Sequence, residues 1–452
     1  MEKLRYPCSL HNHTDFSNFR LRDSINTVES LIDYAIELGH RGVAITEHET
    51  IASHIRAEKY YNKIKENNPD FKLIRGNEIY LVRNGLNGNN YNKENDRYFH
   101  FILLAKDEIG HKQIREISTR AWMRSYVARR MRRVPTYYQD LIDIIGKNPG
   151  HVIGSTACLG GCLPTQLMRN RDDRAPSTDL IKRWIIQIQG IFGKEDFYFE
   201  MQPSFNKDQI YVNHKLVELA NEMGIKYIIT NDAHYLKKED RPIHKAFLNS
   251  QQGDREVDDF YATTYLMSDK EIYEYMEEEM GEEVLQKAYQ NINEIIDKCE
   301  DYSLLKPLKI PKLNWKEATG NELDSYGYEE YFELIPMLKT FASSIYKSDQ
   351  HLAKVIINSI ENNISVQNKE TYNEINACLK DTWVSSEVNG SRWSAYFLNL
   401  QNIIDACWEA GTLVGCGRGS GVGFILLYLL GITQINPLRE KSQTKRWRST
   451  GL

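Results

Sequence analysis

The sequence predicts an α/β domain with a barrel-like or wound sheet, followed by a mostly helical second domain. From Leu4 to about residue 265, short apolar runs alternate with amphipathic stretches, which is the pattern of successive βα units. From about residue 268 the pattern becomes helical and acidic, and the final part is apolar and rich in glycine. At roughly 150 residues per domain, a chain of 452 residues is long enough for two or three domains with buried cores.

The first predicted helix spans residues 24–39. Its apolar residues recur at helical spacing, Ser24 or Asp23 is placed to cap its N-terminus, and Gly39 is placed at its end. Strands are predicted at 42–45, 72–74, 99–104, 151–153, 197–199 and 226–229. Further helices are predicted at about 51–67, 107–124, 178–190 and 208–223. The polar segment 84–95 is predicted to be a hairpin tip or a loop.

The composition excludes several classes of protein. Hydrophobic residues make up 41% of the chain and charged residues 26%, as in folded soluble proteins and unlike disordered ones. No apolar run approaches the ~20 residues of a membrane helix, and the N-terminus has no apolar signal-peptide core. The net charge of −5 argues against indiscriminate coating of nucleic acid, and seven scattered cysteines fit a reducing cytosol. We therefore expect a cytoplasmic protein without membrane partners.

Side chains of the types that bind metals gather at the predicted strand ends. His11 and His13 are two residues apart on an extended segment, so both imidazoles point to the same side and can bind one ion. The other candidates at or near strand ends are His48, Glu78, His100, Cys158, Asp232 and His234. In barrel-like folds the C-terminal strand ends share one face, where their side chains converge. The pattern therefore predicts a multinuclear site for divalent cations.

A single histidine at a strand end is more often an ordinary polar residue than a ligand. We favour that interpretation for His40, His54, His111, His151, His214, His244 and His351. The His-x-His pair at 11–13 occurs together with an Asp-x-His pair at 232–234, however, and two such pairs on different strand ends favour a metal site. Cys162 could supply a second thiolate, although a packing role is the simpler interpretation.

Several of these segments resemble a known family. HNHTDFS at 11–17, AITEHET at 44–50, TACLGG at 156–161 and TNDAHYL at 230–236 are similar to the polymerase-and-histidinol-phosphatase (PHP) domain of bacterial C-family replicative DNA polymerases, the DNA polymerase III alpha subunits. LVGCGRGSGVGFILLYLLGITQINPL at 413–438 resembles the opening of their palm domain. The resemblance implies three parts: a distorted (β/α)7 barrel-like PHP domain at 1–267, the N-terminal part of a mostly helical palm region at 268–438, and a basic, non-matching tail at 439–452.

The resemblance also implies nine metal ligands. They are His11, His13, Asp23, His48, Glu78, His100, Cys158, Asp232 and His234. Two departures from the family leave this set intact. The segment from Asn18 to Arg22 is slightly longer than the usual spacing, and Thr46-Glu47-His48-Glu49 replaces the usual Thr-Asp-His-Gly.

An intact set implies two or three bound divalent ions and retained hydrolytic activity. By resemblance, the reaction is 3′–5′ exonucleolytic proofreading of DNA at a primer end or single strand, with His11, His13, Asp232 and His234 in the catalytic centre. Divalent ions held by imidazole and carboxylate can bind a phosphodiester and generate hydroxide near neutral pH. A donor set of nitrogen, oxygen and one thiolate suits zinc or manganese better than magnesium.

Gly415 to Gly421 form a glycine-rich loop before an apolar run that we predict to be a core helix. Such a loop can bind phosphate through its backbone amides, and a tight turn before a packed helix is an equally good interpretation. The resemblance places Arg418, Gly419 and Ser420 beside the triphosphate of an incoming nucleotide. Cys416 replaces the usual proline of the family, and Val422 replaces a small residue.

The carboxylates that hold two magnesium ions for polymerisation follow this loop in the family. After Ser420 the only carboxylate side chain in the sequence is Glu440. We therefore expect that this chain alone does not polymerise DNA and that a second chain supplies the rest of the palm. A split gene, an interrupted gene and a truncated reading frame would each explain such an end. The resemblance further implies a sliding clamp and other replisome subunits as partners.

A basic segment precedes the predicted strand at 151–153. It contains Arg120, Arg124, Arg129, Arg130, Arg132 and Arg133, interleaved with Trp122 and Tyr126. At helical spacing these residues would form one face that contacts a DNA backbone, and an ordinary solvated helix face is equally expected.

Two other functions compete with the exonuclease. One is a phosphomonoesterase of the histidinol-phosphatase type, which would share the metal site but would have no use for the palm-like segment 413–438. The other is a non-enzymatic scaffold in a polymerase assembly, for which the metal site would be empty.

Overall fold

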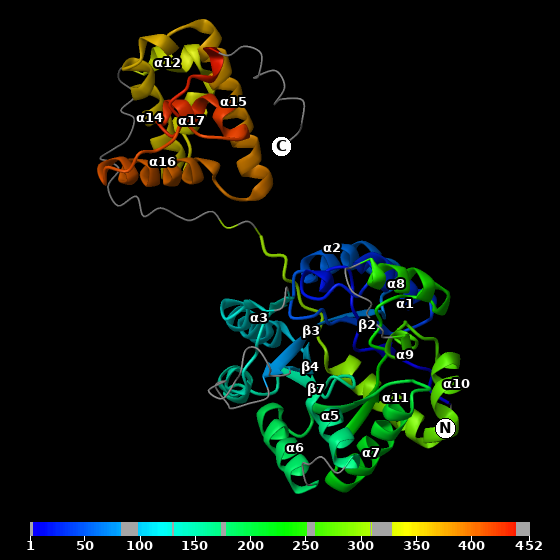
Figure 1. The fold of residues 1–452 in the computed structure, drawn as a ribbon. Helices are drawn as coiled ribbons and strands as arrows, with labels where there is room; N and C mark the ends of the chain where they lie inside the picture. Colours follow the sequence, from blue (N-terminus) through cyan, green and yellow to red (C-terminus); the bar gives the residue numbers. More distant parts are fainter. Residues whose placement is uncertain are drawn as a thin grey trace. The chain divides into compact units, whose positions relative to one another are not determined.

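The computed structural model describes residues 3–82, 98–128, 131–172, 178–250, 258–307, 309 and 328–439. The chain divides into two compact units, residues 1–305 and 306–452. The described part of the first unit combines a sheet with many helices, and that of the second unit is helical (Figure 1). The predicted α/β fold class followed by a mostly helical part is therefore confirmed.

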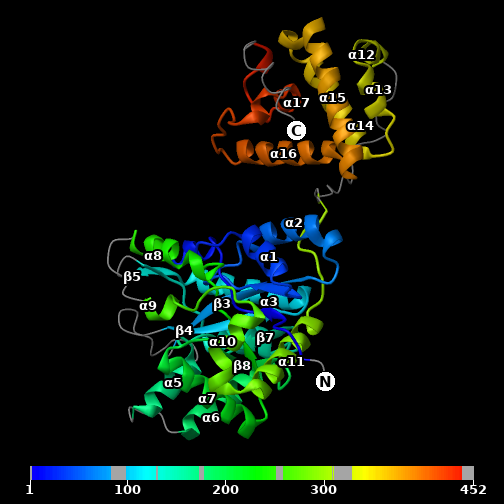
Figure 2. The ribbon, with the colours of Figure 1, turned by 90° about the vertical axis from the view of Figure 1, so that its right-hand side faces the viewer.

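One sheet organises the first unit. Its strands are β1 (Cys8–Ser9), β2 (Gly42–Ile45), β3 (Lys72–Val82), β4 (Tyr98–Ala105), β7 (Val152–Ser155), β8 (Phe197–Met201) and β9 (Lys226–Ile229), hydrogen-bonded in that order. Beyond the ends of β9 and β1, the chain forms a parallel bridge between Asn12 and Ala233, where the His13 amide donates to the Ala233 carbonyl at 2.9 Å. The sheet is thus a nearly closed barrel with helices around its outside (Figures 1 and 2).

Most of the predicted helices are present, with small shifts at their ends. The helices of this unit are α1 (Val28–Glu37), α2 (His54–Ile64), α3 (Glu108–Met123), α4 (Tyr138–Leu141), α5 (Cys162–Arg171), α6 (Thr178–Phe192), α7 (Lys207–Met223), α8 (Arg241–Asn249), α9 (Asp258–Tyr261), α10 (Asp269–Met280) and α11 (Glu282–Lys298). The predicted cap of α1 was wrong, because the Thr27 hydroxyl accepts the Ser30 amide and caps the helix. The Ser24 hydroxyl instead donates to the His13 carbonyl at 3.0 Å.

The direction of β4 matters for the site. β4 pairs antiparallel with β3 and with β7, whereas the other neighbouring strands of the sheet are parallel. The start of β4 therefore lies at the edge of the barrel where the other strands end. His100, near the start of β4, pairs with Tyr80 of β3 and is brought to the same edge as residues that follow β2 and β9.

The boundary between the units lies at Leu305 and not at residue 267 as predicted. The acidic stretch after residue 268 forms α10 and α11, whose buried residues Ile272, Met276, Leu285 and Ile292 belong to the core of the first unit. The Asn291 amide also donates to the Tyr227 carbonyl of β9 at 2.8 Å. The exposed face of these two helices is acidic, and that composition suggested a new domain although the opposite face is apolar.

The second unit is a cluster of helices with its own core. Its helices are α12 (Glu329–Leu334), α13 (Pro336–Ala342), α14 (Lys347–Glu361), α15 (Lys369–Asn389), α16 (Trp393–Glu409) and α17 (Ile425–Leu429). Leu426 and Leu429 of α17 are buried against residues of α14 and α15, so the apolar run after the glycine-rich loop is a short core helix as predicted. No helix in the described ranges has the length and apolar character needed to cross a membrane.

The arginine-rich segment does not form one helical face, so that prediction was wrong. α3 ends at Met123, and the chain continues into an antiparallel pair of short strands, β5 (Tyr126–Ala128) and β6 (Met131–Arg133). The Arg124 guanidinium donates to both carboxylate oxygens of Asp140 at 2.6 and 2.5 Å. Arg129, Arg130 and the predicted loop at 84–95 lie outside the described residues.

Candidate metal centre

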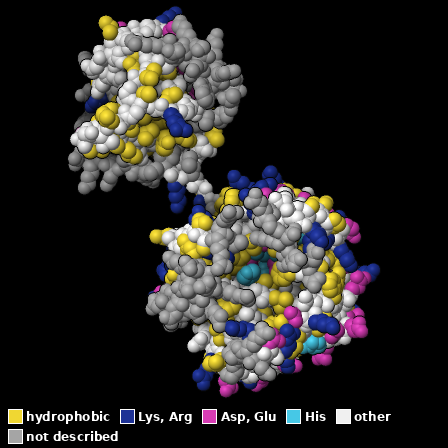
Figure 3. Space-filling view, in the orientation of Figure 1, with side chains coloured by type: hydrophobic (Ala, Val, Ile, Leu, Met, Phe, Trp, Pro, Cys, Tyr) yellow, Lys and Arg dark blue, Asp and Glu magenta, His cyan; other side chains and the backbone are white. Residues whose placement is uncertain are grey.

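The nine side chains predicted as ligands converge at one edge of the barrel. They come from the ends of β1, β2, β7 and β9, from β3 and β4, and from the loop that carries Asp23. Eight of them are buried, and the side chain of His100 is 27% exposed. In the space-filling view a histidine side chain is visible in a hollow of the first unit (Figure 3). The cluster is thus buried but open to solvent on the side of His100.

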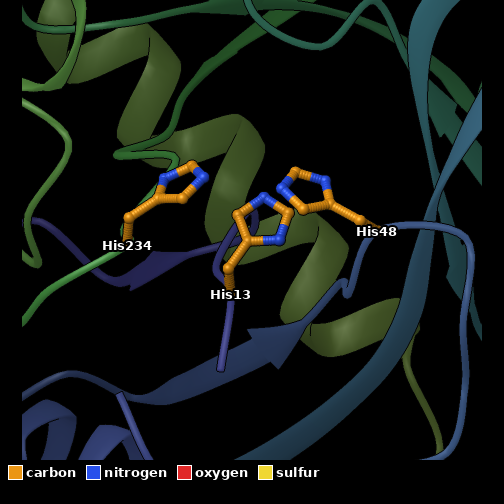
Figure 4. Close-up of side chains that lie close together, drawn as sticks. All are labelled: His13, His48 and His234. Carbon is orange, nitrogen blue, oxygen red and sulfur yellow. The ribbon is translucent and has the colours of Figure 1, made fainter. Parts of the chain in front are cut away.

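Three histidines form the first group. The ring nitrogens of His13, His48 and His234 lie within 4.8 Å of one another, and the three rings gather together from separate segments (Figure 4). Asp23 joins them, because its Oδ2 atom lies 3.2 Å from Nε2 of His48 and 3.6 Å from Nε2 of His234. The Tyr261 hydroxyl donates to the same Asp23 oxygen at 3.2 Å.

Glu78 connects this group to two others. One group joins His11, His13 and Glu78, and another joins Glu78, His100 and Cys158. Oε1 of Glu78 lies 2.7 Å from Nδ1 of His100, and Oε2 contacts Nδ1 of His48. The Cys158 sulfur lies 3.4 Å from Nδ1 of His100. Because His13 and Glu78 each belong to two groups, the three groups are contiguous and could hold more than one ion.

Two glycines allow the Cys158 loop to reach the cluster. A Cβ atom at Gly160 would lie 3.1 Å from the His100 ring, and one at Gly161 would lie 2.0 Å from the Thr156 carbonyl oxygen. The His100 amide donates to the Gly160 carbonyl at 3.0 Å, so the loop pairs with the start of β4. The glycines of TACLGG are therefore needed for close approach.

The cluster is also where the backbone is strained. Among the described non-glycine residues, positive φ angles occur at Glu49 (55°), Ala157 (56°) and Asp232 (50°). Each of these residues is a member of the cluster or is adjacent to one in the sequence. Left-handed backbone at non-glycine residues costs free energy and is concentrated at functional sites.

Sequence analysis missed Glu200, which orients His11. Oε1 of Glu200 lies 2.7 Å from Nδ1 of His11, while the hydroxyls of Ser155 and Thr230 each donate to Glu200 at 2.6 Å. Such a contact fixes which imidazole nitrogen is free to bind a metal. The available signal was a glutamate within the apolar strand Phe197–Met201, where a carboxylate must be paired to be buried.

The unusual Glu47 supports the histidines from behind. Its carboxylate accepts the Thr14 amide at 3.0 Å and the Ser17 hydroxyl at 2.5 Å. The Ser17 oxygen is also 2.9 Å from Nδ1 of His13 and accepts the His48 amide at 3.1 Å. Glu47 stands where the family resemblance predicts an aspartate, and its longer side chain accepts hydrogen bonds from the loop that carries His13.

Burial and neighbouring charges shift the pKa values of the histidines and carboxylates in the cluster. Burial disfavours protonation of His48, but the carboxylates of Asp23 and Glu78 outweigh it and raise the imidazole pKa to about 10. Burial and the neighbouring imidazoles of His48 and His234 lower the pKa of His13 to about 3. Burial disfavours ionisation of Asp23, yet the imidazoles of His48 and His234 bring its pKa well below the ordinary range. The ionised carboxylate of Asp23 thus lies beside the His48 imidazole, whose pKa is raised, whereas the pKa of His13 is lowered.

The donor atoms fit bound cations. Oδ1 of Asp232 faces Nε2 of His11 at 3.2 Å and Nε2 of His13 at 3.1 Å without forming a hydrogen bond. Oδ1 of Asp23 is also buried without a hydrogen-bond partner. Buried carboxylate oxygens are normally paired, and a divalent cation would satisfy these two. Imidazole, carboxylate and thiolate are the ligands that zinc and manganese take in proteins.

The other predicted candidates lie elsewhere. Cys162 is buried in the core of the first unit, accepts a hydrogen bond from the Gln166 amide, and belongs to none of the ligand groups found among the described residues. Arg418, Gly419 and Ser420 lie in an exposed loop of the second unit, where Gly417 and Gly419 have positive φ angles of 93° and 84°. Their contact with a nucleotide stays a prediction.

Comparison with known proteins agrees with this arrangement. Residues 9–204 match the PHP domain family, and residues 346–448 match the bacterial DNA polymerase III alpha NTPase domain. The chain is a relative of the DNA polymerase III alpha subunits. Over 95% of its length it is 35% identical to the probable DNA polymerase YorL of Bacillus subtilis and to the DNA-directed DNA polymerase of Bacillus phage SPbeta, each covered to 34%. It is 27% identical to the DNA polymerase III subunit alpha of Borreliella burgdorferi, covered to 33%.

The chain thus spans about a third of the length of these curated polymerases. The PHP-domain match precedes the NTPase-domain match in the chain. The second match ends at residue 448 and therefore includes most of the tail at 439–452 that was predicted not to resemble the family. Among solved structures, a putative metal-dependent phosphoesterase from Bifidobacterium adolescentis aligns with a TM-score of 0.33 and 14% identity, over 61% of this chain and 97% of its own.

Proposed function

We propose that the first unit is a metal-dependent phosphoesterase that removes nucleotides from the 3′ end of DNA, as the proofreading part of a replicative polymerase in the cytoplasm. The observation that carries this proposal is the convergence of nine donor side chains on one edge of the barrel. A merely structural PHP-like domain has no need to bury this many imidazoles and carboxylates together, since their desolvation is costly without cations.

The residues assigned to the metals are His11, His13, Asp23, His48, Glu78, His100, Cys158, Asp232 and His234. Two or three zinc or manganese ions bound there would polarise a phosphodiester and lower the pKa of a bound water. Within the centre, we assign His11, His13, Asp232 and His234 to catalysis. Glu200 keeps the Nδ1 side of His11 occupied, so that its Nε2 atom faces the centre. Asp232 faces both His11 and His13 with an unpaired oxygen.

A DNA 3′ end is favoured over a small phosphomonoester because of what accompanies the PHP domain. Residues 346–448 match a polymerase domain, for which a histidinol-phosphatase type of enzyme has no use. Within the whole protein we expect DNA polymerisation with magnesium, completed by palm carboxylates outside this sequence, and contacts with a sliding clamp and other replisome subunits.

The test is hydrolysis by the full chain of a single-stranded oligonucleotide labelled at its 5′ end. With manganese or zinc, we expect stepwise release of nucleotides from the 3′ end. His13→Ala and Asp232→Asn should each reduce the rate by more than about 100-fold. Substitution of a residue that only hydrogen-bonds to a metal ligand costs up to about 100-fold, and loss of the ligand itself should cost more. His214→Ala, which changes a half-exposed histidine of α7 that pairs with Glu279 and belongs to none of the described ligand groups, is the matched control and should retain the full rate.

Two outcomes would favour the competing functions. Faster turnover of a phosphomonoester than of the oligonucleotide would point to a small-molecule phosphatase. A folded protein that contains no metal by elemental analysis and hydrolyses neither substrate would point to a scaffold.

A further inference from the structure

Arg20 is a buried arginine beside the metal centre that the assigned ligand set does not use. It lies in the loop between His13 and Asp23, directly after a short 3-10 turn at Ser17–Phe19. Its amide donates to the Ser17 carbonyl at 2.9 Å, which fixes the backbone. Only 6% of the residue is exposed. This loop is the segment that is longer than the spacing expected from the family resemblance.

The guanidinium has unfilled bonding capacity. Its Nε and Nη1 atoms are buried and have no hydrogen-bond partner among the described residues. No carboxylate in the described ranges lies within 4 Å of it as an ion-pair partner. The nearby Glu49 instead accepts the Tyr80 amide. A buried arginine almost always has a partner, because the desolvation of an unpaired cation is costly. The absence of one among the described residues indicates that the partner is a ligand.

A single tyrosine separates Arg20 from the proposed metal ligands. The Arg20 guanidinium carbon lies 4.9 Å from the centre of the Tyr80 ring. The Tyr80 hydroxyl lies 3.0 Å from Nδ1 of His48, and its ring stacks on His100 with 4.5 Å between ring centres. Stacking on an aromatic ring holds a guanidinium in a fixed orientation. Tyr80 thus contacts both Arg20 and His100, the member of the cluster that is open to solvent.

We propose that Arg20 binds the phosphate of the nucleotide that occupies the metal centre, and that it is a substrate-positioning residue of this chain. The proposal rests on the proposed function, since it requires that the centre accepts a nucleotide. A guanidinium offers planar N–H donors that match two phosphate oxygens, whereas a lysine offers only a point charge. The Nε and Nη1 atoms, which have no partner among the described residues, are each available to donate to a phosphate oxygen.

The experiment compares binding of thymidine monophosphate by the wild-type chain with that by Arg20→Gln and Arg20→Lys. By titration calorimetry in the presence of manganese, we expect Arg20→Gln to bind at least tenfold more weakly and Arg20→Lys to lie between the two. Thymidine, which lacks the phosphate, should not distinguish the three proteins. Arg56→Gln is the control, because Arg56 also lies over an aromatic ring, that of Phe16, but is exposed and paired with Glu29.

A second measurement separates ligand binding from a structural role. If Arg20 is unpaired in the free protein, Arg20→Met should raise the melting temperature without ligand and abolish the increase that thymidine monophosphate causes in the wild type. A lower melting temperature with unchanged nucleotide affinity would overturn the proposal. Equal affinity of Arg20→Gln and the wild type would also overturn it.

Failure of the proposed function gives a different result. If the metal-loaded wild type hydrolyses no DNA, the exonuclease proposal fails whatever Arg20→Gln binds. If the wild type hydrolyses DNA and Arg20→Gln has the same KM and kcat, only the assignment of Arg20 fails. We expect a KM for the oligonucleotide that is about tenfold higher in Arg20→Gln, with equal metal content in both proteins.

Discussion

The two candidate sites of this chain differ in how the fold holds them. In the metal centre of the first unit, the donor side chains contact one another, as His100 and Glu78 do at 2.7 Å, and Glu200, Glu47 and Ser17 hold them from behind. In the second unit, Gly415 to Gly421 form an exposed loop before the short helix α17. Preorganised chemistry therefore resides in the first unit, where the fold itself sets the positions of the donor groups, whereas the described glycine-rich segment of the second unit is exposed.

Each of the two units contains a buried ion pair between a carboxylate and a guanidinium. In the first unit Glu58 pairs with Arg75 at 3.1 Å and also accepts the Leu304 amide, which ties down the end of the unit. In the second unit Asp349 pairs with Arg392 at 2.7 Å. Removal of one partner of a buried pair costs about 3–5 kcal/mol.

We therefore expect Glu58→Ala and Asp349→Ala to destabilise different units, each by about 3 kcal/mol. Hydrogen exchange resolved along the chain should show faster exchange in α2 and α11 for the first variant and in α14 and α16 for the second. Glu29→Ala, which breaks an exposed pair with Arg56, should cost less than about 1 kcal/mol. Uniformly faster exchange in both units after either change would contradict two separately stabilised cores.

A smaller effect is expected from one substitution made at both candidate sites. Cys158 is buried in the metal centre, whereas Cys416 is exposed in the glycine-rich loop. Cys158→Ser replaces a soft thiolate by a hydroxyl, so the affinity for zinc should fall about tenfold or more. Cys416→Ser should leave the zinc affinity unchanged. Competition with a chromogenic chelator measures both values, and an equal affinity of the two variants would remove Cys158 from the ligand set.

Much of the first unit could be predicted from sequence, because local patterns determine it. Short apolar runs predicted most strands of the barrel, and amphipathic stretches between them predicted α3, α6 and α7. The unit boundary was predicted at the wrong residue because that prediction, too, rested on local composition alone. The acidic residues of α10 and α11 describe only their exposed face, and the contact of α11 with β9 depends on chain segments far apart in sequence.

The candidate site could be predicted to the extent that its residues lie in short motifs. His-x-His and Asp-x-His stand at strand ends, and family resemblance added Asp23, which sequence reasoning alone had assigned as a possible helix cap. Glu200 and Arg20 could not be found in this way, since each is important because of its burial and its partners. The signal for Glu200 is a carboxylate within an apolar strand, which does not name its partner, and an arginine in a loop has no signal until the fold shows what surrounds it.

The smallest expected effect concerns pH and again separates the units. His54 and His111 of the first unit are packed together, with 3.0 Å between Nδ1 of His54 and Nε2 of His111. Burial and the charges of the neighbouring imidazole and of Arg75 lower the pKa of His54 well below its ordinary value. Burial and Arg75 lower the pKa of His111 to about 4. The only histidine in the sequence of the second unit is the half-buried His351.

The sign follows from proton uptake. Below pH 6.5 the unfolded chain binds protons at these histidines while the folded unit does not, so the stability of the first unit falls as the pH falls from about 6.5 toward 4. Each histidine should contribute about 0.7 kcal/mol of this loss between pH 7 and pH 6. His111→Gln should reduce the pH dependence of urea unfolding by that amount, measured against the wild type at equal metal concentration. An unchanged dependence would mean that His111 takes up a proton in the folded unit, which its contact with His54 and its burial oppose.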